Sequence, residues 1–205
     1  MKKLVIICIF AVAMLATLAG CQKKNSEKAQ AAIKSEADIS GKYYAKITVE
    51  GYGEIEVELD ADAAPVTVQN FMDLVNEGFY DGLTFHRIIS GFMIQGGDPN
   101  GNGTGGSGTN IIGEFKNNGI DNPLKHERGT LSMARSRDNN SASSQFFIMH
   151  EDSPHLDDDY AAFGHVTSGM EVVDKICETV KPVDSNGTVA PEDQPVIEKI
   201  EMIEK

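Results

Sequence analysis

The stretch from Phe85 to Gly106, FHRIISGFMIQGGDPNGNGTGG, holds side chains whose types and spacing could do chemistry. Four of them fall within nine positions: Arg87, Phe92, Met93 and Gln95. The guanidinium is a permanently charged, planar donor, and it stands near one amide and two apolar side chains. Such a set could stabilise a developing charge or lone pair by hydrogen bonding. Taken alone, the stretch could also be a core strand followed by a loop.

Two later stretches carry similar side chains. Residues 132–148, SMARSRDNNSASSQFFI, end in a short strand-like run that contains Gln145 and Phe147. Residues 155–166, HLDDDYAAFGHV, follow shortly afterwards. Each of these, considered by itself, is also compatible with a core strand and its loop.

Other motifs fit their usual chemistry poorly. The glycines at 101, 103 and 106 have dinucleotide-loop spacing, but they follow a loop and open no helical pattern. His150 and His155 are one residue too far apart for a zinc helix, which Pro154 would break. The acidic run 157–159 is best interpreted as a solvated turn, and no nucleophile-elbow sequence is present. We therefore predict no metal and no cofactor.

The three stretches together resemble the cyclophilin family of peptidyl-prolyl cis-trans isomerases. The resemblance covers about residues 43–203 and is most specific at four segments: Phe85–Arg87, Gly91–Asp98, Gly103–Gly106 and Ser144–Phe147. It implies a mostly β fold, a closed eight-stranded antiparallel barrel capped by two α-helices, with a proline site on one outer face. The implied activity is that of a rotamase (EC 5.2.1.8) acting on proline-containing peptide segments.

The resemblance also assigns roles to residues. The catalytic residue would be Arg87, and four side chains would surround the proline ring: Phe92, Met93, Phe147 and Leu156. The substrate backbone would be held by Gln95, by Gln145 and by the main chain around Ala134 and Arg135. His86 also matches the family, as a packing and hydrogen-bonding residue beside the arginine and not as a proton carrier.

Four positions depart from the family pattern. His155 stands where the family has a tryptophan at the pocket rim, and Tyr160 replaces a pocket histidine. Ser90 replaces a proline before the Gly-Phe-Met triplet, and Arg135 replaces an asparagine. We keep His155 and Tyr160 among the substrate-binding residues. Because the tryptophan makes much of the family's contact with cyclosporin, we expect only weak cyclosporin binding.

Hydrophobic spacing predicts the elements that position these residues. Alternation before and after the Gly51-Tyr52-Gly53 turn predicts a hairpin with one buried face. Helical spacing predicts one helix from Pro65 to about Gly78 and a second from about Gly169 to Thr179. Further strands are predicted at Thr84–Ile89, Thr130–Arg135, Gln145–Met149, Ala161–Val166 and Val196–Ile203.

The amino terminus has the layout of an export signal. Lys2 and Lys3 precede an apolar stretch of 15 residues, Leu4–Leu18, which is short for a spanning helix. The sequence Leu18-Ala19-Gly20-Cys21 resembles the bacterial lipobox, which implies cleavage before Cys21 and attachment of lipid, including palmitate, to that residue. An ordinary secretory signal with a chance cysteine is the alternative.

The resulting division is a lipoprotein signal peptide at 1–20, a lipidated Cys21 with a flexible tether to 41, and an isomerase domain at 42–205. Cys8 would leave with the signal peptide, so Cys177 would be the remaining free cysteine and no intramolecular disulfide could form. We expect its thiol to be buried and inert.

Composition limits the partners. The net charge is −13, and loss of Lys2 and Lys3 with the signal would make it −15. This excess of acid argues against nucleic acid and against adhesion to an anionic membrane. We expect a monomer outside the cytoplasm, anchored to the cell membrane by its lipid and acting on exported proteins. Two alternatives remain, a peptide-binding chaperone module with little catalysis and a ligand-capturing lipoprotein of a transporter.

Overall fold

The computed structural model describes residues 33–205. The predicted signal peptide, the predicted lipidation site Cys21 and most of the predicted tether lie outside these residues. The chain packs against the domain from Lys34 onward, ahead of the predicted domain boundary. The Lys34 carbonyl accepts a hydrogen bond from the Ile112 amide at 2.9 Å, and the Lys34 ammonium group lies 2.8 Å from the Asp73 carboxylate. Ile39 packs on the core.

The predicted hairpin is confirmed as β2 (Lys42–Val49) and β3 (Gly53–Asp60). Alternate residues on both strands are buried, so one face of the hairpin covers the core. Gly51 takes a φ of 72°, a value that suits glycine in the connecting turn.

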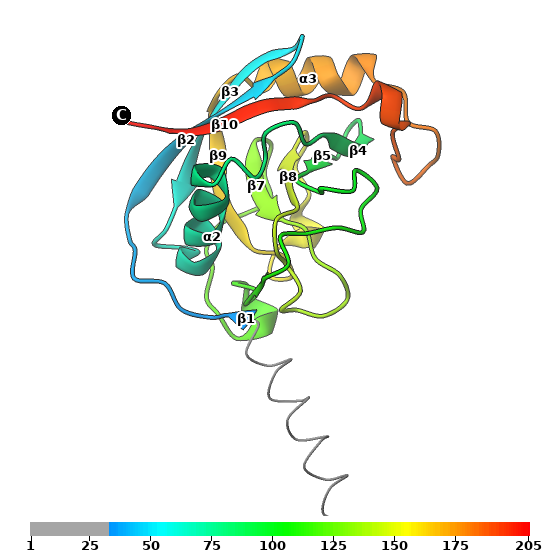
Figure 1. Cartoon of the computed structure of the whole chain (residues 1–205). Helices are drawn as coiled ribbons and strands as arrows, with labels where there is room; N and C mark the ends of the chain where they lie inside the picture. Colours follow the sequence, from blue (N-terminus) through cyan, green and yellow to red (C-terminus); the bar gives the residue numbers. More distant parts are fainter. Residues whose placement is uncertain (1–32) are drawn as a thin grey trace, which may run out of the picture. The chain divides into compact units, whose positions relative to one another are not determined.

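The sheet has eight antiparallel strands in the order β10-β2-β3-β9-β7-β8-β5-β4 (Figure 1). The strands beyond the hairpin are β4 (Phe85–Ile89), β5 (Met93–Gly96), β7 (Thr130–Met133), β8 (Phe146–Met149), β9 (Ala162–Ser168) and β10 (Ile197–Ile203). Five of them lie where strands were predicted, within a few residues, whereas β5 was recognised only as part of a motif. Two-residue strands β1 (Ile33–Lys34) and β6 (Asn110–Ile111) form a separate pair.

The prediction of a closed barrel is corrected, because the curled sheet stays open along most of the seam between β4 and β10. The two sides meet at one end, where Thr84 bridges Val196. Further along, the free edge of β4 is occupied by the loop at 187–189: the Ile88 amide donates to the Gly187 carbonyl, and the Val189 amide donates to the His86 carbonyl. That loop satisfies the edge groups that a closing strand would otherwise pair.

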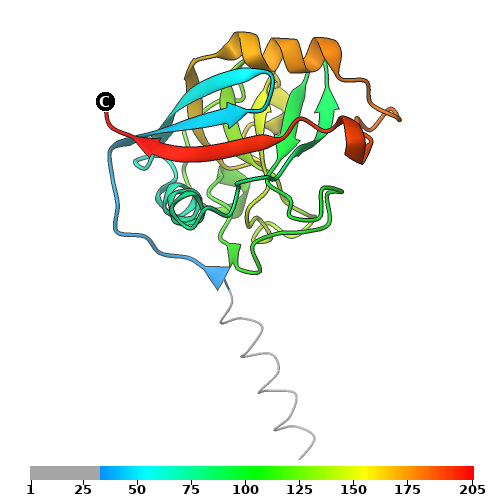
Figure 2. The same cartoon turned by 45° about the horizontal axis from the view of Figure 1, so that its top comes forward.

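Both predicted helices are present, and the two views place them on different sides of the curled sheet (Figures 1 and 2). Helix α2 (Pro65–Asn76) starts with proline, and α3 (Met170–Thr179) buries Val172, Val173 and Ile176 as expected. The start of α2 lacks a cap of its own. Its Val66 and Thr67 amides instead donate to the buried Glu114 carboxylate at 3.0 and 2.7 Å.

Within the described part of the chain, no helix is both long and apolar enough to span a membrane. The same residues contain no cluster of three or more histidine, cysteine or acidic side chains that could hold a metal ion. Cys177 is free and buried, and burial raises the pKa of its thiol to about 12. The thiol is therefore protonated and unreactive at neutral pH.

Candidate active site

Three neighbouring strands bring three of the predicted site residues together on one outer face of the sheet. In the antiparallel register, Arg87 of β4 faces Gln95 of β5, and Gln95 faces Phe147 of β8. Residues that face one another across a ladder point to the same side of the sheet. The cation, the amide and the aromatic ring therefore lie in a row across three strands.

The apolar part of the site is a second hydrophobic cluster, separate from the main core. Its buried members are Met93, Phe147, Met149 and Leu156. Beside it lies a cavity of about 150 Å³ lined by Arg87, Phe92, Met93, Gln95, Ala134, Arg135, Phe147, Leu156 and Tyr160. A small cavity that combines apolar side chains with arginine and glutamine side chains suits an apolar ring attached to a polar backbone.

Arg87 is held from two sides. Its Nε donates to the Asn186 carbonyl at 2.7 Å, and its Nη1 donates to Gln95 Oε1 at 3.2 Å. Among the described residues no carboxylate forms an ion pair with this guanidinium. Partial burial lowers the pKa of Arg87, opposed by Tyr160 and Asp184, yet an arginine so placed keeps its charge.

A chain of amide hydrogen bonds continues from the arginine. Gln95 Nε2 donates to Gln145 Oε1 at 2.9 Å, and Gln145 Nε2 donates to the Gly105 carbonyl at 2.9 Å. This chain leads into a second cavity of about 470 Å³, which shares Gln95, Ala134 and Arg135 with the first and is otherwise lined by glycine and polar residues. An extended peptide could therefore place its ring in the smaller cavity and its backbone along the larger one.

A family model described as "Cyclophilin type peptidyl-prolyl cis-trans isomerase/CLD" matches residues 44–202. The chain belongs to the cyclophilin family. Its enzyme class is therefore peptidyl-prolyl cis-trans isomerase, EC 5.2.1.8.

Named relatives agree with this cyclophilin assignment. Peptidyl-prolyl cis-trans isomerase B of Bacillus subtilis is 54% identical over 123 residues, which are 60% of this chain and 82% of that protein. A peptidyl-prolyl cis-trans isomerase of Helicobacter pylori is 46% identical over 144 residues, 69% of this chain and 84% of the relative. Longer relatives also match, such as the isomerase-like 2 protein of Aspergillus oryzae, of which the chain spans 22%.

A solved structure gives the same result for the fold. The cyclophilin type isomerase of Cryptosporidium parvum, crystallised in the presence of the dipeptide Ala-Pro, superposes with a TM-score of 0.69 at 32% identity. The match covers 79% of this chain and 99% of that one. The curled antiparallel sheet with two helices is thus the cyclophilin fold.

Most residues predicted for the cyclophilin site line one of the two cavities, and two do not. His155 is exposed, and its ring stacks on Phe92 with centroids 5.8 Å apart, so it lies at the rim. His86 is only 4% exposed, and neither ring nitrogen has a hydrogen-bond partner. Burial lowers the pKa of His86, which keeps the ring neutral; the ring is packed as expected, although the expected hydrogen bond is absent.

The departures at Arg135 and Tyr160 belong together. The Arg135 guanidinium lies 4.7 Å from the Tyr160 ring centroid and donates from Nε and Nη2 to the Asp159 carbonyl, at 3.0 and 2.8 Å. The Tyr160 ring in turn meets Phe147 edge-on, with centroids 6.0 Å apart. The arginine thus braces one wall of the cavity by a cation–π contact.

Sequence reasoning missed the residues that support the site from behind. His126 stacks on Phe147 with centroids 6.1 Å apart, and its ring nitrogens lie 3.0 Å from Asp157 Oδ1 and 2.9 Å from Ser132 Oγ. Asn186 holds Arg87 through a backbone carbonyl, which has no sequence signature. One available signal was the run Phe146–Met149, which is apolar on both faces and so predicts a cover on its outer side.

Proposed function

We propose that this enzyme accelerates rotation about prolyl bonds by hydrogen bonding from Arg87 to the prolyl nitrogen of a twisted amide. The observation that carries the proposal is the position of the guanidinium at the edge of the apolar cavity. It is held through Nε by the Asn186 carbonyl, and it has no carboxylate partner among the described residues.

The chemistry requires only differential binding. Amide resonance gives the prolyl bond a rotational barrier of about 18–20 kcal/mol. When the amide twists, conjugation is lost and the nitrogen lone pair becomes localised, so the nitrogen becomes a better acceptor than in either planar form. A donor placed beside that nitrogen therefore stabilises the transition state more than the ground state. No bond is made or broken, and no proton is transferred.

The surrounding residues increase the value of that hydrogen bond. The wall formed by Phe92, Met93, Phe147 and Leu156 would enclose the ring and exclude water, which strengthens the interaction with the cation. Gln95, Gln145 and the main chain at Ala134 would hold the backbone on one side while the other side turns.

The test is the cis-to-trans exchange rate of a proline tetrapeptide, followed by isomer-specific proteolysis, with wild type and Arg87→Ala. One charged hydrogen bond contributes about 1.5–3 kcal/mol, so kcat/KM should fall roughly 10- to 150-fold. Arg87→Lys should recover little of this, since an ammonium cannot keep the Asn186 and Gln95 contacts and also reach the substrate.

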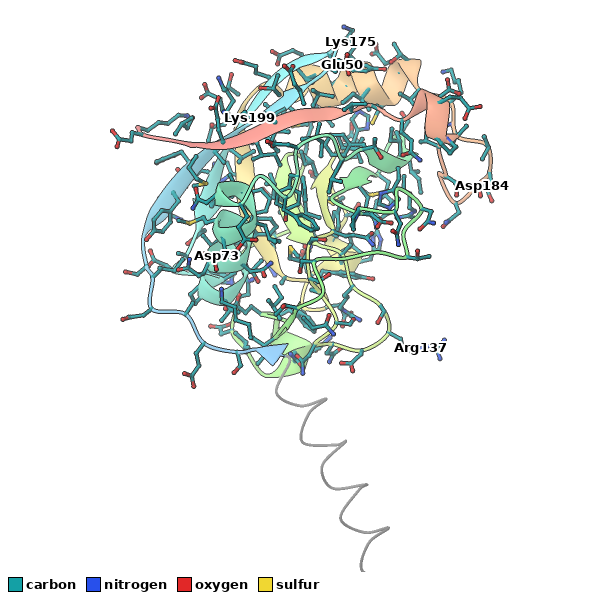
Figure 3. All side chains as sticks on the ribbon, in the orientation of Figure 1. Glu50, Asp73, Arg137, Lys175, Asp184 and Lys199 are labelled. Atoms are coloured by element: carbon teal, nitrogen blue, oxygen red, sulfur yellow. The ribbon has the colours of Figure 1, made fainter. Side chains whose placement is uncertain are left out.

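Arg137 provides the matched control. It is an exposed arginine that lines neither cavity, and Figure 3 shows it extending outward from the loop between β7 and β8. Arg137→Ala should leave the exchange rate unchanged. Near wild-type rates for Arg87→Ala, with normal unfolding curves for both variants, would overturn the arginine mechanism.

We further propose that the enzyme works outside the cytoplasm, anchored to the membrane through lipidated Cys21, on proline-containing segments of exported proteins. The support is the basic start, the apolar stretch and the lipobox-like tetrapeptide at residues 18–21. Prolyl exchange can limit the folding of such clients. Cys21→Ser should abolish labelling by radioactive palmitate, and unchanged labelling would contradict the anchor.

Cyclosporin should inhibit this enzyme weakly. His155 occupies the rim position of the family's tryptophan and offers a smaller, exposed ring. His155→Trp should therefore lower the inhibition constant for cyclosporin, and equal inhibition of both proteins would refute this explanation. We also propose that the protein is a monomer. Light scattering of the purified protein would measure its oligomeric state.

A further inference from the structure

The turn at residues 90–92, which carries Phe92, is held by the side chain of His150, the residue that directly follows β8. Gly91 has a φ of 79°, and the Phe92 amide closes the turn by donating to the Ile89 carbonyl at 3.0 Å. The Gly91 amide donates to Nδ1 of His150 at 2.9 Å, and the His150 amide donates to the Phe92 carbonyl at 2.8 Å. His150 thus binds the turn through both its ring and its backbone.

These contacts define the protonation state of the ring. An amide N–H can donate only to an imidazole nitrogen that carries a lone pair, so Nδ1 is unprotonated and the ring hydrogen is on Nε2. Nε2 lies 3.3 Å from Asp174 Oδ1 on α3. The neutral ring therefore bridges the turn and the helix, and the His150 side chain is 15% exposed.

Arg128 fixes the far end of this bridge. Its Nη2 donates to both carboxylate oxygens of Asp174 at 2.7 and 2.8 Å, and its Nη1 donates to the His150 carbonyl at 2.7 Å. The Arg128 amide donates to Asp152 Oδ1 at 2.8 Å, which anchors this segment as well. The charged groups facing the imidazole are thus Asp174 and Arg128, with Asp152 and Glu151 nearby on the same loop.

We propose that His150 is a positioning residue for Phe92: with Nδ1 unprotonated it holds the 90–92 turn so that Phe92 closes the proline cavity. This inference rests on the proposed function, because it assumes that the cavity takes the proline ring. Phe92 is the cavity-lining residue carried by that turn, so a shift of the turn moves one wall and leaves Arg87 in place.

The same geometry makes the wall sensitive to acid. A proton on Nδ1 would face the Gly91 N–H and place two donors against each other. The protonated His150 ring would still be attracted by the Asp174 carboxylate. The turn must then release its Gly91 contact. Phe92 contributes binding and not the charged hydrogen bond, so the Kd and KM for peptide should rise while kcat changes little.

Two substitutions separate positioning from simple packing. His150→Asn keeps an acceptor close to the Nδ1 position and cannot be protonated, whereas His150→Leu keeps bulk and removes the acceptor. His150→Leu should weaken binding of a proline tetrapeptide roughly two- to tenfold, the effect of one neutral hydrogen bond. His150→Asn should bind like wild type at pH 7.5. His165→Leu, at an exposed histidine on β9, is the matched control.

The decisive readout is the Kd of that tetrapeptide between pH 7.5 and 5.5, measured by titration together with the amide NMR shift of Gly91. Wild type and the His165→Leu control should lose affinity on acidification, with a matching movement of the Gly91 signal, whereas His150→Asn, which retains the exposed His155 at the rim, should lose less affinity and show no movement of the Gly91 signal. Equal pH dependence in wild type and His150→Asn would overturn the proposal. Failure of the proposed proline site is distinct, because then even wild type would not bind the tetrapeptide at pH 7.5.

Discussion

The two faces of strand β8 are equally buried but are used differently. Phe146 and Ile148 point into the main core, whereas Phe147 and Met149 point outward into the second cluster, and all four are at most 5% exposed. The Phe146 ring meets the rings of Phe71, Tyr80 and Phe85 at centroid distances of 5.5, 5.6 and 6.2 Å. Phe147 instead lies between His126 and Tyr160 and lines the 150 Å³ cavity.

The difference teaches that burial alone does not separate a core residue from a residue that lines a cavity. Phe146 is surrounded by aromatic rings, whose mutual packing stabilises the fold. Phe147 is backed by a histidine in a hydrogen-bond network and keeps one side on a cavity beside a cation. We therefore propose that one face of the strand contributes mainly to stability and the other mainly to recognition.

Alanine substitution of Phe146 and of Phe147, one at a time, tests this contrast directly and should give the largest effect on stability. Phe146→Ala should cost about 3–5 kcal/mol of unfolding free energy, because it opens a cavity inside closely packed rings. Phe147→Ala should cost less, since its ring already lies on a cavity, but it should weaken proline-peptide binding. Urea unfolding and peptide titration measure the two quantities. Equal stability losses with unchanged peptide affinity would remove the distinction.

A second prediction displaces the backbone carbonyl that holds Arg87 and leaves both faces of β8 unchanged. Gly187 has a φ of 86°, and a Cβ built there would lie 2.7 Å from the Ile88 carbonyl oxygen. Gly187→Ala should push this loop, which also carries Asp184 (Figure 3), away from β4 and displace the Asn186 carbonyl from Arg87. A displacement near 1 Å can cost up to about 100-fold in rate, so kcat should fall roughly 10- to 100-fold.

The control for this change is Gly119→Ala. Gly119 has nearly the same φ, 85°, but a Cβ there would meet nothing within 4 Å, and the residue lies away from both cavities. The two variants therefore carry a similar backbone strain, and only Gly187→Ala should lose kcat. A parallel loss in both would mean that strain, and not the position of Arg87, controls the rate.

Local patterns in the sequence predicted the elements, and the family resemblance predicted most of the residues that line the smaller cavity. Alternation around the Gly51 turn predicted the hairpin, and the spacing of Val172, Val173 and Ile176 predicted the buried face of α3. The residues lining the apolar cavity followed from the family resemblance, because the motifs preserve their order and spacing. Both kinds of prediction depend on side-chain types and on their spacing along the chain.

Features that depend on distant backbone groups could not be predicted. Arg87 and Asn186 are 99 positions apart, and their contact uses a carbonyl that any residue could supply. The open seam has the same origin, since the Gly187 carbonyl and the Val189 amide bond to the free edge of β4. The capping of α2 by Glu114, 48 positions from Val66, likewise follows only from the assembled fold.

The smallest expected effect comes from a comparison of two neighbouring residues on β4, the buried His86 and the half-buried Arg87. Burial lowers the pKa of His86, partly offset by Asp98 and reinforced by Arg87. The unfolded chain, in which a histidine titrates near about pH 6.5, therefore binds the proton first, and stability should fall as pH drops below that value, by at most about 1.4 kcal/mol per pH unit. His86→Leu should reduce the pH slope of the unfolding free energy between pH 6.5 and 5.5, leaving the part due to the buried His126, and His165→Leu should not. An unchanged pH slope in His86→Leu would show that the ring is not held neutral behind the arginine.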